Sequence, residues 1–369
     1  MPDFSAIVSL VRGPIPAKPP VAIWALPPTT NGVMGGVPDM VRFYFDLDER
    51  LRLEQRLHDL LPEAIVLPGF WPSLGVVVEA SAFGGRMIWS RKAAPHIFPS
   101  LRSPEDIDSL KPPRPGETGL TPLFLTQMET MKRMLAEKGL NLSRIIKSMG
   151  PAEIAGLLLG YDGLFLGLYD HPRRIKTLLN MITEFVIEWL HLQEARVGEA
   201  EVLQLAEHVP GQISAEQVEE FVLPCMKAIY SEFPRPAKIY HNEGWHSDRH
   251  IKTILRFGAE IWHFGSDVHS LPDIYSKVGS ALVPFGGINP HGPMRHGTPE
   301  EVRAETRQVL AASRGRRLLL STGTGTTPET TLENVRAMIE TAVCGYLPSP
   351  ATQRSPLLPL LMCGLRFAI

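Results

Sequence analysis

The chain has 369 residues, 44% of them hydrophobic, and a formal net charge of −2. This length allows a sizeable buried core, and the balanced charge argues against a nucleic-acid partner. The three cysteines are far apart, which excludes a disulfide framework and a Cys-x-x-Cys metal site and favours a cytoplasmic protein. No apolar run approaches the roughly 20 residues of a membrane-spanning helix, so we expect no membrane role.

Proline and glycine divide the chain into alternating strand-like and helix-like segments. In the first half, strands are predicted at 19–27, 63–75 and 143–151, a strand or Gly-Gly hairpin at 76–90, and helices at 39–62, 103–110, 120–139, 156–168 and 171–198. In the second half, helical stretches separate strands predicted at 201–209, 237–244, 259–267, 281–287 and 316–323. This α/β alternation favours a (β/α)8 TIM barrel with an N-terminal embellishment over an open sheet.

We expect one domain over residues 1–369, with an N-terminal extension at 1–18 and a C-terminal tail at 350–369. The proline-rich segment at 111–119 is an alternative boundary. The tail is apolar but short and interrupted by prolines, so a terminal segment is favoured over a membrane anchor.

Three of the later strands end in polar or glycine residues: AKIYHNEGWH (237–246), ALVPFGGINP (281–290) and RRLLLSTGTGTTPETTLENV (316–335). In parallel α/β folds, ligands bind at the carboxyl ends of the strands. We therefore expect the functional site at the mouth of the barrel. The Ser-Thr-Gly-rich segment lacks the Gly-Lys-Ser/Thr ending of a P-loop.

His241 and Glu243 are the first candidates for chemistry. Residues two apart in a strand point to the same side, so both side chains can face one point. Imidazole nitrogen and carboxylate oxygen are both zinc ligands, but zinc needs a third or fourth ligand. Neighbouring strand ends offer Glu207 with His208, His263 with Asp267, or Thr324 through a water. The alternative is a hydrogen-bonded network that binds substrate without a metal.

For the other candidate residues, the sequence allows a structural role as well as a functional one. Glu207 is predicted to act as a general base or substrate anchor, or else to stabilise a loop. Asp267 and Asn289 follow strands and are predicted to face a ligand, whereas His263 equally suits a satisfied core histidine. Trp71 is predicted to form an aromatic wall of the substrate site, although core packing is the commoner role of a tryptophan.

These residues, in this order, resemble the uroporphyrinogen decarboxylase superfamily, which includes barrel methyltransferases that work with corrinoid proteins. The most specific matches are FGSDVHSLPDIYSKVGSALVPFGGINP (264–290) and STGTGTTPETTLENVRAMIETA (321–342). PPVAIWALP (19–27) is similar to the opening strand, and SMGPAEIAGLLLGYDGLFLGLYDHPRRIKTLL (148–179) to the Gly-Pro helix region.

The chain departs from two branches of that superfamily. The decarboxylases carry arginines after the first strand and a histidine in the closing Gly-x-Gly, whereas here the segment after the strand has no arginine before Arg42, and Thr324 takes the histidine's place. The thiol-activating methyltransferases carry His-x-Cys and a further cysteine in the Gly-x-Gly; here the pattern is His241-x-Glu243 with Thr324. This argues against both porphyrinogen decarboxylation and zinc–thiolate activation of a thiol.

What remains of the resemblance implies a methyltransferase that moves a methyl group between a methoxylated, aromatic small molecule and a corrinoid (cobalamin), free or on a partner protein. His241 and Glu243 would hold zinc or supply an acid, with Asp267 as a further catalytic group. Glu207, His263, Asn289, Thr324 and Trp71 would bind the substrate. The alternatives are a metal-independent decarboxylase or lyase with Asp267 or Glu207 as proton donor, and a non-catalytic partner protein.

Overall fold

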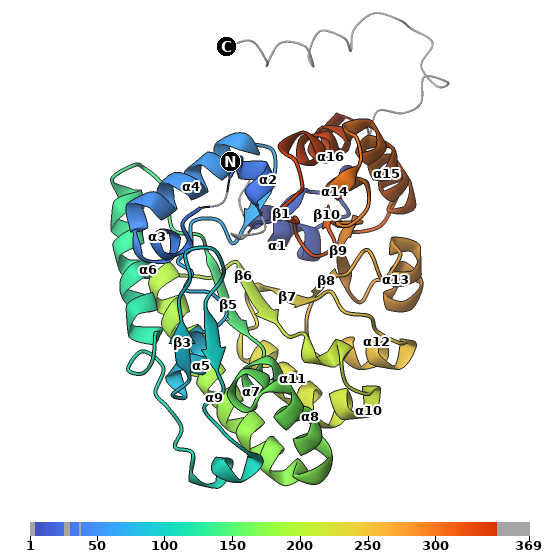
Figure 1. Cartoon of the computed structure of the whole chain (residues 1–369). Coiled ribbons are helices and arrows are strands. Elements are labelled where there is room, and N and C mark those ends of the chain that lie inside the picture. Colours follow the sequence, from blue (N-terminus) through green and yellow to red (C-terminus); the bar gives the residue numbers. More distant parts are fainter. Residues whose placement is uncertain (1–3, 26–29, 37, 345–369) are drawn as a thin grey trace, which may run out of the picture.

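The computed structural model describes residues 4–25, 30–36 and 38–344. Within these residues, eight parallel strands form the barrel (Figure 1). Six of them pair in the order β10-β9-β8-β7-β6-β5, and β1 pairs with β2. The strands are β1 (Ala22–Trp24), β2 (Ile65–Leu67), β5 (Ile145–Met149), β6 (Val202–Ala206), β7 (Ala237–Asn242), β8 (Ile261–Phe264), β9 (Val283–Ile288) and β10 (Leu319–Thr322).

The barrel closes on one side and is only loosely joined on the other. A parallel bridge between Val21 and Leu320 connects β1 to β10. Between β2 and β5 the described residues form no strand ladder, and the backbone N–H of Ser143 donates to the carbonyl of Phe70 at 3.0 Å. We call this junction the β2–β5 seam. The expected (β/α)8 fold is confirmed.

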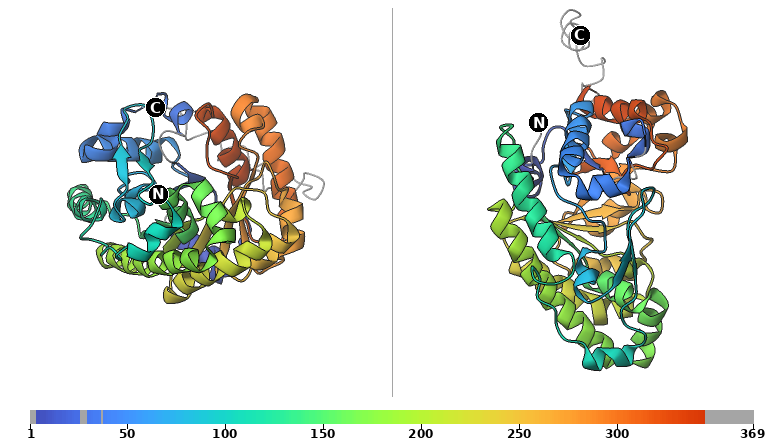
Figure 2. Two further views of the ribbon diagram at one scale, coloured as in Figure 1. Left: turned by 60° about the horizontal axis from the view of Figure 1, so that its bottom comes forward. Right: turned by 60° about the vertical axis from the view of Figure 1, so that its left-hand side comes forward.

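Helices follow each strand and surround the barrel (Figure 2). After β1 come α2 (Asn31–Met34), α3 (Met40–Phe45) and α4 (Leu47–Leu60). After β2 come α5 (Val78–Ala82), the strands β3 (Arg86–Ile88) and β4 (His96–Phe98), η1 (Pro104–Ser109) and α6 (Thr121–Ala136). After β5 come α7 (Pro151–Leu159), α8 (Tyr161–Asp170) and α9 (Pro172–Val197).

The second half of the barrel has shorter connections. After β6 come η2 (Val209–Gly211), α10 (Ala215–Gln217), η3 (Val218–Val222) and α11 (Leu223–Glu232). The last strands are followed by α12 (Asp248–Ile254), α13 (Leu271–Val278), α14 (Pro293–His296), α15 (Pro299–Ala312) and α16 (Leu332–Cys344). Within the described residues no single helix is long and apolar enough to span a membrane, although the pair α7 and α8, bent by 106°, passes the same test of length and composition.

Residues 1–18 were predicted to be an extension, and most of it is described. Helix α1 (Ser5–Arg12) buries Ile7 and Leu10. Arg317, which precedes β10, donates to the carbonyls of Leu10 at 2.8 Å and Gly13 at 2.7 Å. Helix α1 therefore packs at the end of the barrel opposite the mouth. The predicted tail at 350–369 lies outside the described residues, and the extent of the domain stays a prediction.

Three predicted elements differ from the structure. The helix at 39–62 is interrupted at Asp46, whose carboxylate accepts a hydrogen bond from the N–H of Glu49 at 3.0 Å and so starts α4. The apolar helix around 156–168 is broken by Gly160, whose φ of 74° is accessible to glycine at little cost. The segment 76–90 is not a Gly-Gly hairpin: residues 78–82 are helical, and β3 pairs with β4 instead.

The register of the parallel strands places two histidines in one layer near the mouth. Ala206, His241 and His263 are partners across β6, β7 and β8. Partners in adjacent strands point to the same side of a sheet. Trp24 of β1 contacts both histidine rings, so this layer faces the interior of the barrel.

Candidate metal centre

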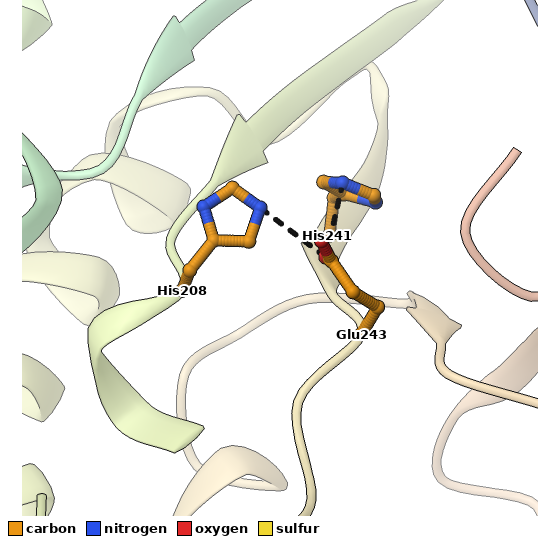
Figure 3. A group of neighbouring side chains, drawn as sticks. All are labelled: His208, His241 and Glu243. Atoms are coloured by element: carbon orange, nitrogen blue, oxygen red, sulfur yellow. Dashed lines mark ion pairs between the residues drawn. The ribbon is translucent and has the colours of Figure 1, made fainter. Parts of the chain in front are cut away.

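Three side chains at the ends of β6 and β7 converge on one point (Figure 3). Nε2 of His208 lies 3.2 Å, and Nε2 of His241 3.4 Å, from Oε2 of Glu243. His241 is the fifth residue of β7, Glu243 follows the strand, and His208 follows β6. The predicted pairing of His241 with Glu243 is therefore seen, and His208 is the neighbouring side chain that joins them.

The cluster is strongly polarised. Burial alone would lower the pKa of His208, but the carboxylates of Glu153 and Glu243, each within ion-pair distance of a ring nitrogen, outweigh burial and raise that pKa to about 10. Burial alone would raise the pKa of Glu243, but the charged His208 beside it outweighs burial and holds that pKa well below its usual range. Without a metal, the imidazolium of His208 therefore lies between two carboxylates.

His241 is held by a second histidine. Its Nδ1 lies 2.8 Å from Nδ1 of His263, and Nε2 of His263 lies 3.1 Å from the carbonyl oxygen of Thr322. A carbonyl only accepts, so Nε2 of His263 carries a proton and its Nδ1 must accept from His241. Burial, followed by the neighbouring His263, lowers the pKa of His241 well below its usual value, so the ring is neutral. Its Nε2 then presents a lone pair to Glu243.

Glu153 was missed by the sequence analysis. Its Oε2 lies 3.3 Å from Nδ1 of His208, and it also accepts a hydrogen bond from Tyr161. Glu153 is the third residue of α7, and α7 begins directly after the carboxyl end of β5. This position places Glu153 at the mouth, beside His208. The sequence did contain one feature that could have identified Glu153: it is an acidic residue in the first turn of a helix that begins with Gly-Pro.

Glu207 is fully buried beside the cluster. Its Oε2 accepts from the backbone N–H groups of Ala152 at 2.8 Å and Glu153 at 3.3 Å, at the start of α7. Burial and the charge of Glu153 nevertheless raise the pKa of Glu207 to about 8. Two donated N–H bonds favour the carboxylate, but they do not compensate for full burial. A Cβ at Gly150 would lie 2.5 Å from Cβ of Glu207, so the helix start and this side chain are in direct contact.

The donor set fits a metal ion. The ligand atoms of His208, His241 and Glu243 all lie within 4.8 Å of one another. Among the described residues, the buried Oε2 of Glu243 makes no hydrogen bond despite the two nearby nitrogens. Both imidazoles are oriented by an outer partner, Glu153 for one and His263 for the other, as metal-bound histidines are. Two nitrogens and one carboxylate are a ligand set of catalytic zinc sites, which keep a further position open.

The other predicted site residues lie apart from this cluster. Asp267 pairs with His291 at 3.9 Å, and Asn289 accepts from the N–H of His291 at 2.9 Å, so these three form a separate group after β8 and β9. Thr324 is half-buried in the loop after β10, between glycines packed against Ser266 and Trp24. The predicted catalytic role of Asp267 and the predicted substrate-binding roles of Asn289 and Thr324 stay predictions.

Two cavities lie near the ends of β1, β2 and β5, and neither is lined by the three cluster residues. The larger, about 330 Å³, lies beside α3 and α4 and has both arginines and acidic residues in its wall, including Arg42, Arg50 and Glu54. The smaller, about 130 Å³, lies at the β2–β5 seam and includes Trp71. Trp71 is 1% exposed, so it is both a core residue and a cavity wall.

Comparisons with known proteins agree with this fold. The chain is 27% identical over 284 residues to a methylated-thiol–coenzyme M methyltransferase of Methanosarcina mazei, covering 76% of this chain and 72% of that one. It is 24% identical over 257 residues to a uroporphyrinogen decarboxylase of Prochlorococcus marinus, covering 67% of this chain and 69% of that one. A solved structure of a methyltransferase from M. mazei superposes with a TM-score of 0.74 at 18% identity, covering 93% of this chain and 99% of that one. Because the uroporphyrinogen decarboxylase (URO-D) family model also matches residues 69–343, the chain belongs to that family.

Proposed function

We propose that this chain is a methyltransferase that moves a methyl group between a small methoxylated substrate, aromatic in character, and the cobalt of a corrinoid. The cluster of His208, His241 and Glu243 supports this proposal most directly, because its donor set suits stabilisation of a departing oxygen. The likeness to a methyltransferase over most of both chains points the same way. The corrinoid, free or carried by a partner protein, enters as the co-substrate.

The balance of the reaction sets what the site must do. In transfer to the corrinoid, the methyl carbon would form a bond to Co(I) as its carbon–oxygen bond breaks, the electron pair would go to oxygen, and a proton would neutralise the alkoxide or phenolate. When bound by His208, His241 and Glu243, zinc would supply a Lewis acid for that oxygen. No serine or cysteine nucleophile is needed, so the protein contributes position and charge stabilisation.

The chain's own residues have distinct roles in this proposal. His263 fixes the tautomer of His241, so that Nε2 offers a lone pair. Glu153 orients His208 through Nδ1. Glu207, which is buried and whose pKa is raised to about 8, lies beside these groups and is suited to hold a proton near the substrate oxygen.

Metal content tests the site. The purified protein, measured by mass spectrometry for metals, should contain near-stoichiometric zinc, and His208→Ala, His241→Ala and Glu243→Ala should each lose it. His291→Ala is the matched control, because that histidine pairs with Asp267 outside the cluster and its loss should leave the zinc in place. A folded wild-type protein that transfers methyl groups without metal would refute the metal site.

Methyl transfer is tested separately. Methylcobalamin formation from Co(I) cobalamin and a methoxylated aromatic compound should be visible by absorbance, and a chelator should stop it until zinc is restored. A decarboxylase or lyase, with Glu207 as proton donor, is the second candidate, because that carboxyl is buried and its pKa is raised. Turnover that needs no corrinoid and survives chelation would favour this candidate over methyl transfer.

A further inference from the structure

The cavity at the β2–β5 seam opens between two strands that are not hydrogen-bonded to each other as a ladder. Its volume is about 130 Å³. Four aromatic side chains from four different segments form much of its wall: Tyr44, Trp71, Phe124 and Trp189. The polar groups that reach it include Lys147, Ser148 and Glu79. An apolar cavity with a few polar groups is the usual composition of a small-molecule site.

Lys147 is a cation inside the barrel. It is the third residue of β5, and its strand partner in β6 is Gln204. Its Nζ lies 5.3 Å from the ring of Trp24, which also stacks on His241 with centroids 5.6 Å apart. The ammonium makes no hydrogen bond or ion pair within 4.0 Å to any other residue that the structure describes.

No neighbouring polar group forms an ion pair or a hydrogen bond with the Lys147 ammonium within the part of the chain that the structure describes. Glu79 accepts a hydrogen bond from Ser148 Oγ at 2.9 Å and is not within ion-pair distance of Lys147. The amide of Gln204, 1% exposed, has no hydrogen-bond partner for either its nitrogen or its oxygen among the described residues. Lys147 lines this cavity and is half-buried, whereas the Gln204 amide is buried without a partner. A cation partly withdrawn from water and an unpaired buried amide are costly to maintain, which indicates that a ligand completes them.

We propose that Lys147 and Gln204 form an anion-binding subsite for the carboxylate of the substrate, which makes the substrate class a methoxylated aromatic carboxylic acid. The Lys147 ammonium pairs with the carboxylate, and the Gln204 amide donates a further hydrogen bond. The aromatic walls exclude water and so strengthen the ion pair. Burial lowers the pKa of Lys147 to about 8, and at neutral pH the side chain still carries its charge.

The position of Trp24 relates this subsite to the metal centre. Its ring centroid lies 5.6 Å from that of His241 and 5.3 Å from Nζ of Lys147. A flat ring lying against Trp24 would reach Lys147 with its carboxylate and direct its methoxy oxygen to His241. The placement of the methoxy group rests on the proposed function. Carboxylate binding does not, because it requires neither a corrinoid nor turnover.

Calorimetric titration of the full-length protein tests the subsite. The ligands are 4-methoxybenzoate and its neutral analogue 4-methoxybenzamide, and the variants are Lys147→Met, Gln204→Leu and, as a surface control, Lys277→Met. A hydrogen bond to a charged group contributes about 1.5–3 kcal/mol, so the benzoate should bind the wild type about 10- to 100-fold more tightly than it binds Lys147→Met. The benzamide should bind the wild type and Lys147→Met alike.

The titration results either support or overturn the carboxylate subsite. Loss of the preference for benzoate in Lys147→Met but not in Lys277→Met supports the subsite. Equal binding of benzoate and benzamide to the wild type, or no binding of either, overturns it. Glu79→Gln is the second variant: it should leave benzoate binding unchanged or tighten it, and weaker binding would overturn the assignment. Benzoate binding without methyl transfer would refute the proposed function and leave the subsite intact.

Discussion

Replacing Lys147 by methionine is expected to stabilise the fold at neutral pH. The pKa of Lys147 falls from 10.5 to about 8, mainly because burial penalises the charged form and Glu79 only partly compensates. At 1.36 kcal/mol for each pKa unit, the buried charge costs roughly 3 kcal/mol. Methionine keeps the unbranched stem but removes the charge and the contact of the ammonium with Trp24, so the net gain should be about 2–3 kcal/mol.

The pH dependence follows from the direction of the shift. A base whose pKa is lower in the folded state binds its proton more readily when unfolded, so the cost is fully present below pH 8 and fades as the pH rises toward 10.5. The advantage of Lys147→Met should therefore shrink to below about 1 kcal/mol near pH 10. A stabilising change at the proposed carboxylate-binding residue would be an instance of the trade-off between stability and function.

Urea unfolding at pH 7 and near pH 10 provides the measurement. Lys238→Met is the matched control, because Lys238 is also a half-buried lysine of a barrel strand. The wild type, the variant and the control should show the same slope against denaturant. If Lys147→Met is less stable than the wild type at pH 7, or if its advantage does not change with pH, then Lys147 has a stabilising partner and the reasoning is refuted.

Three further changes test the site and its support. His263→Leu should lower zinc affinity about 10- to 100-fold, because His241 loses its outer partner; zinc competition assays measure this, and unchanged affinity would contradict the tautomer assignment. Glu153→Gln should weaken zinc binding by a similar factor through His208, and stronger binding would contradict its orienting role. Gly150→Ala should destabilise the fold by about 1–3 kcal/mol, because the added methyl group would overlap Glu207. The control Gly163→Ala should change stability by less than about 1 kcal/mol. Equal effects of the two changes in thermal unfolding would contradict the contact with Glu207.

The parts of the site that the sequence predicted are those that follow strand geometry. The alternation of β7 is sufficient to pair His241 with Glu243, and parallel strands end together, so His208 was a candidate neighbour. The barrel itself follows from repeated strand–helix alternation. These inferences need only local periodicity and one rule about strand direction.

The residues that were missed depend on contacts between distant segments. Glu153 reaches His208 only because α7 starts against Glu207, and nothing near position 153 in the sequence records that contact. Lys147 was read as part of a strand, although a lone lysine in IIKSM was a visible anomaly. Residues 78–82 were assigned to a strand that begins with the three valines at 76–78, which favour one, and tertiary packing buries residues 78–82 as a helix instead.

The packing of Gly150 against Glu207 has a consequence for how this sequence can vary. Any side chain at position 150 would require the space that the Glu207 side chain fills, and removing Glu207 would leave two N–H groups of α7 without their acceptor. The two positions can therefore change only together. In related chains, a glycine before the proline at this strand end would mark those that keep the buried acid, and a larger residue there would mark a different site chemistry.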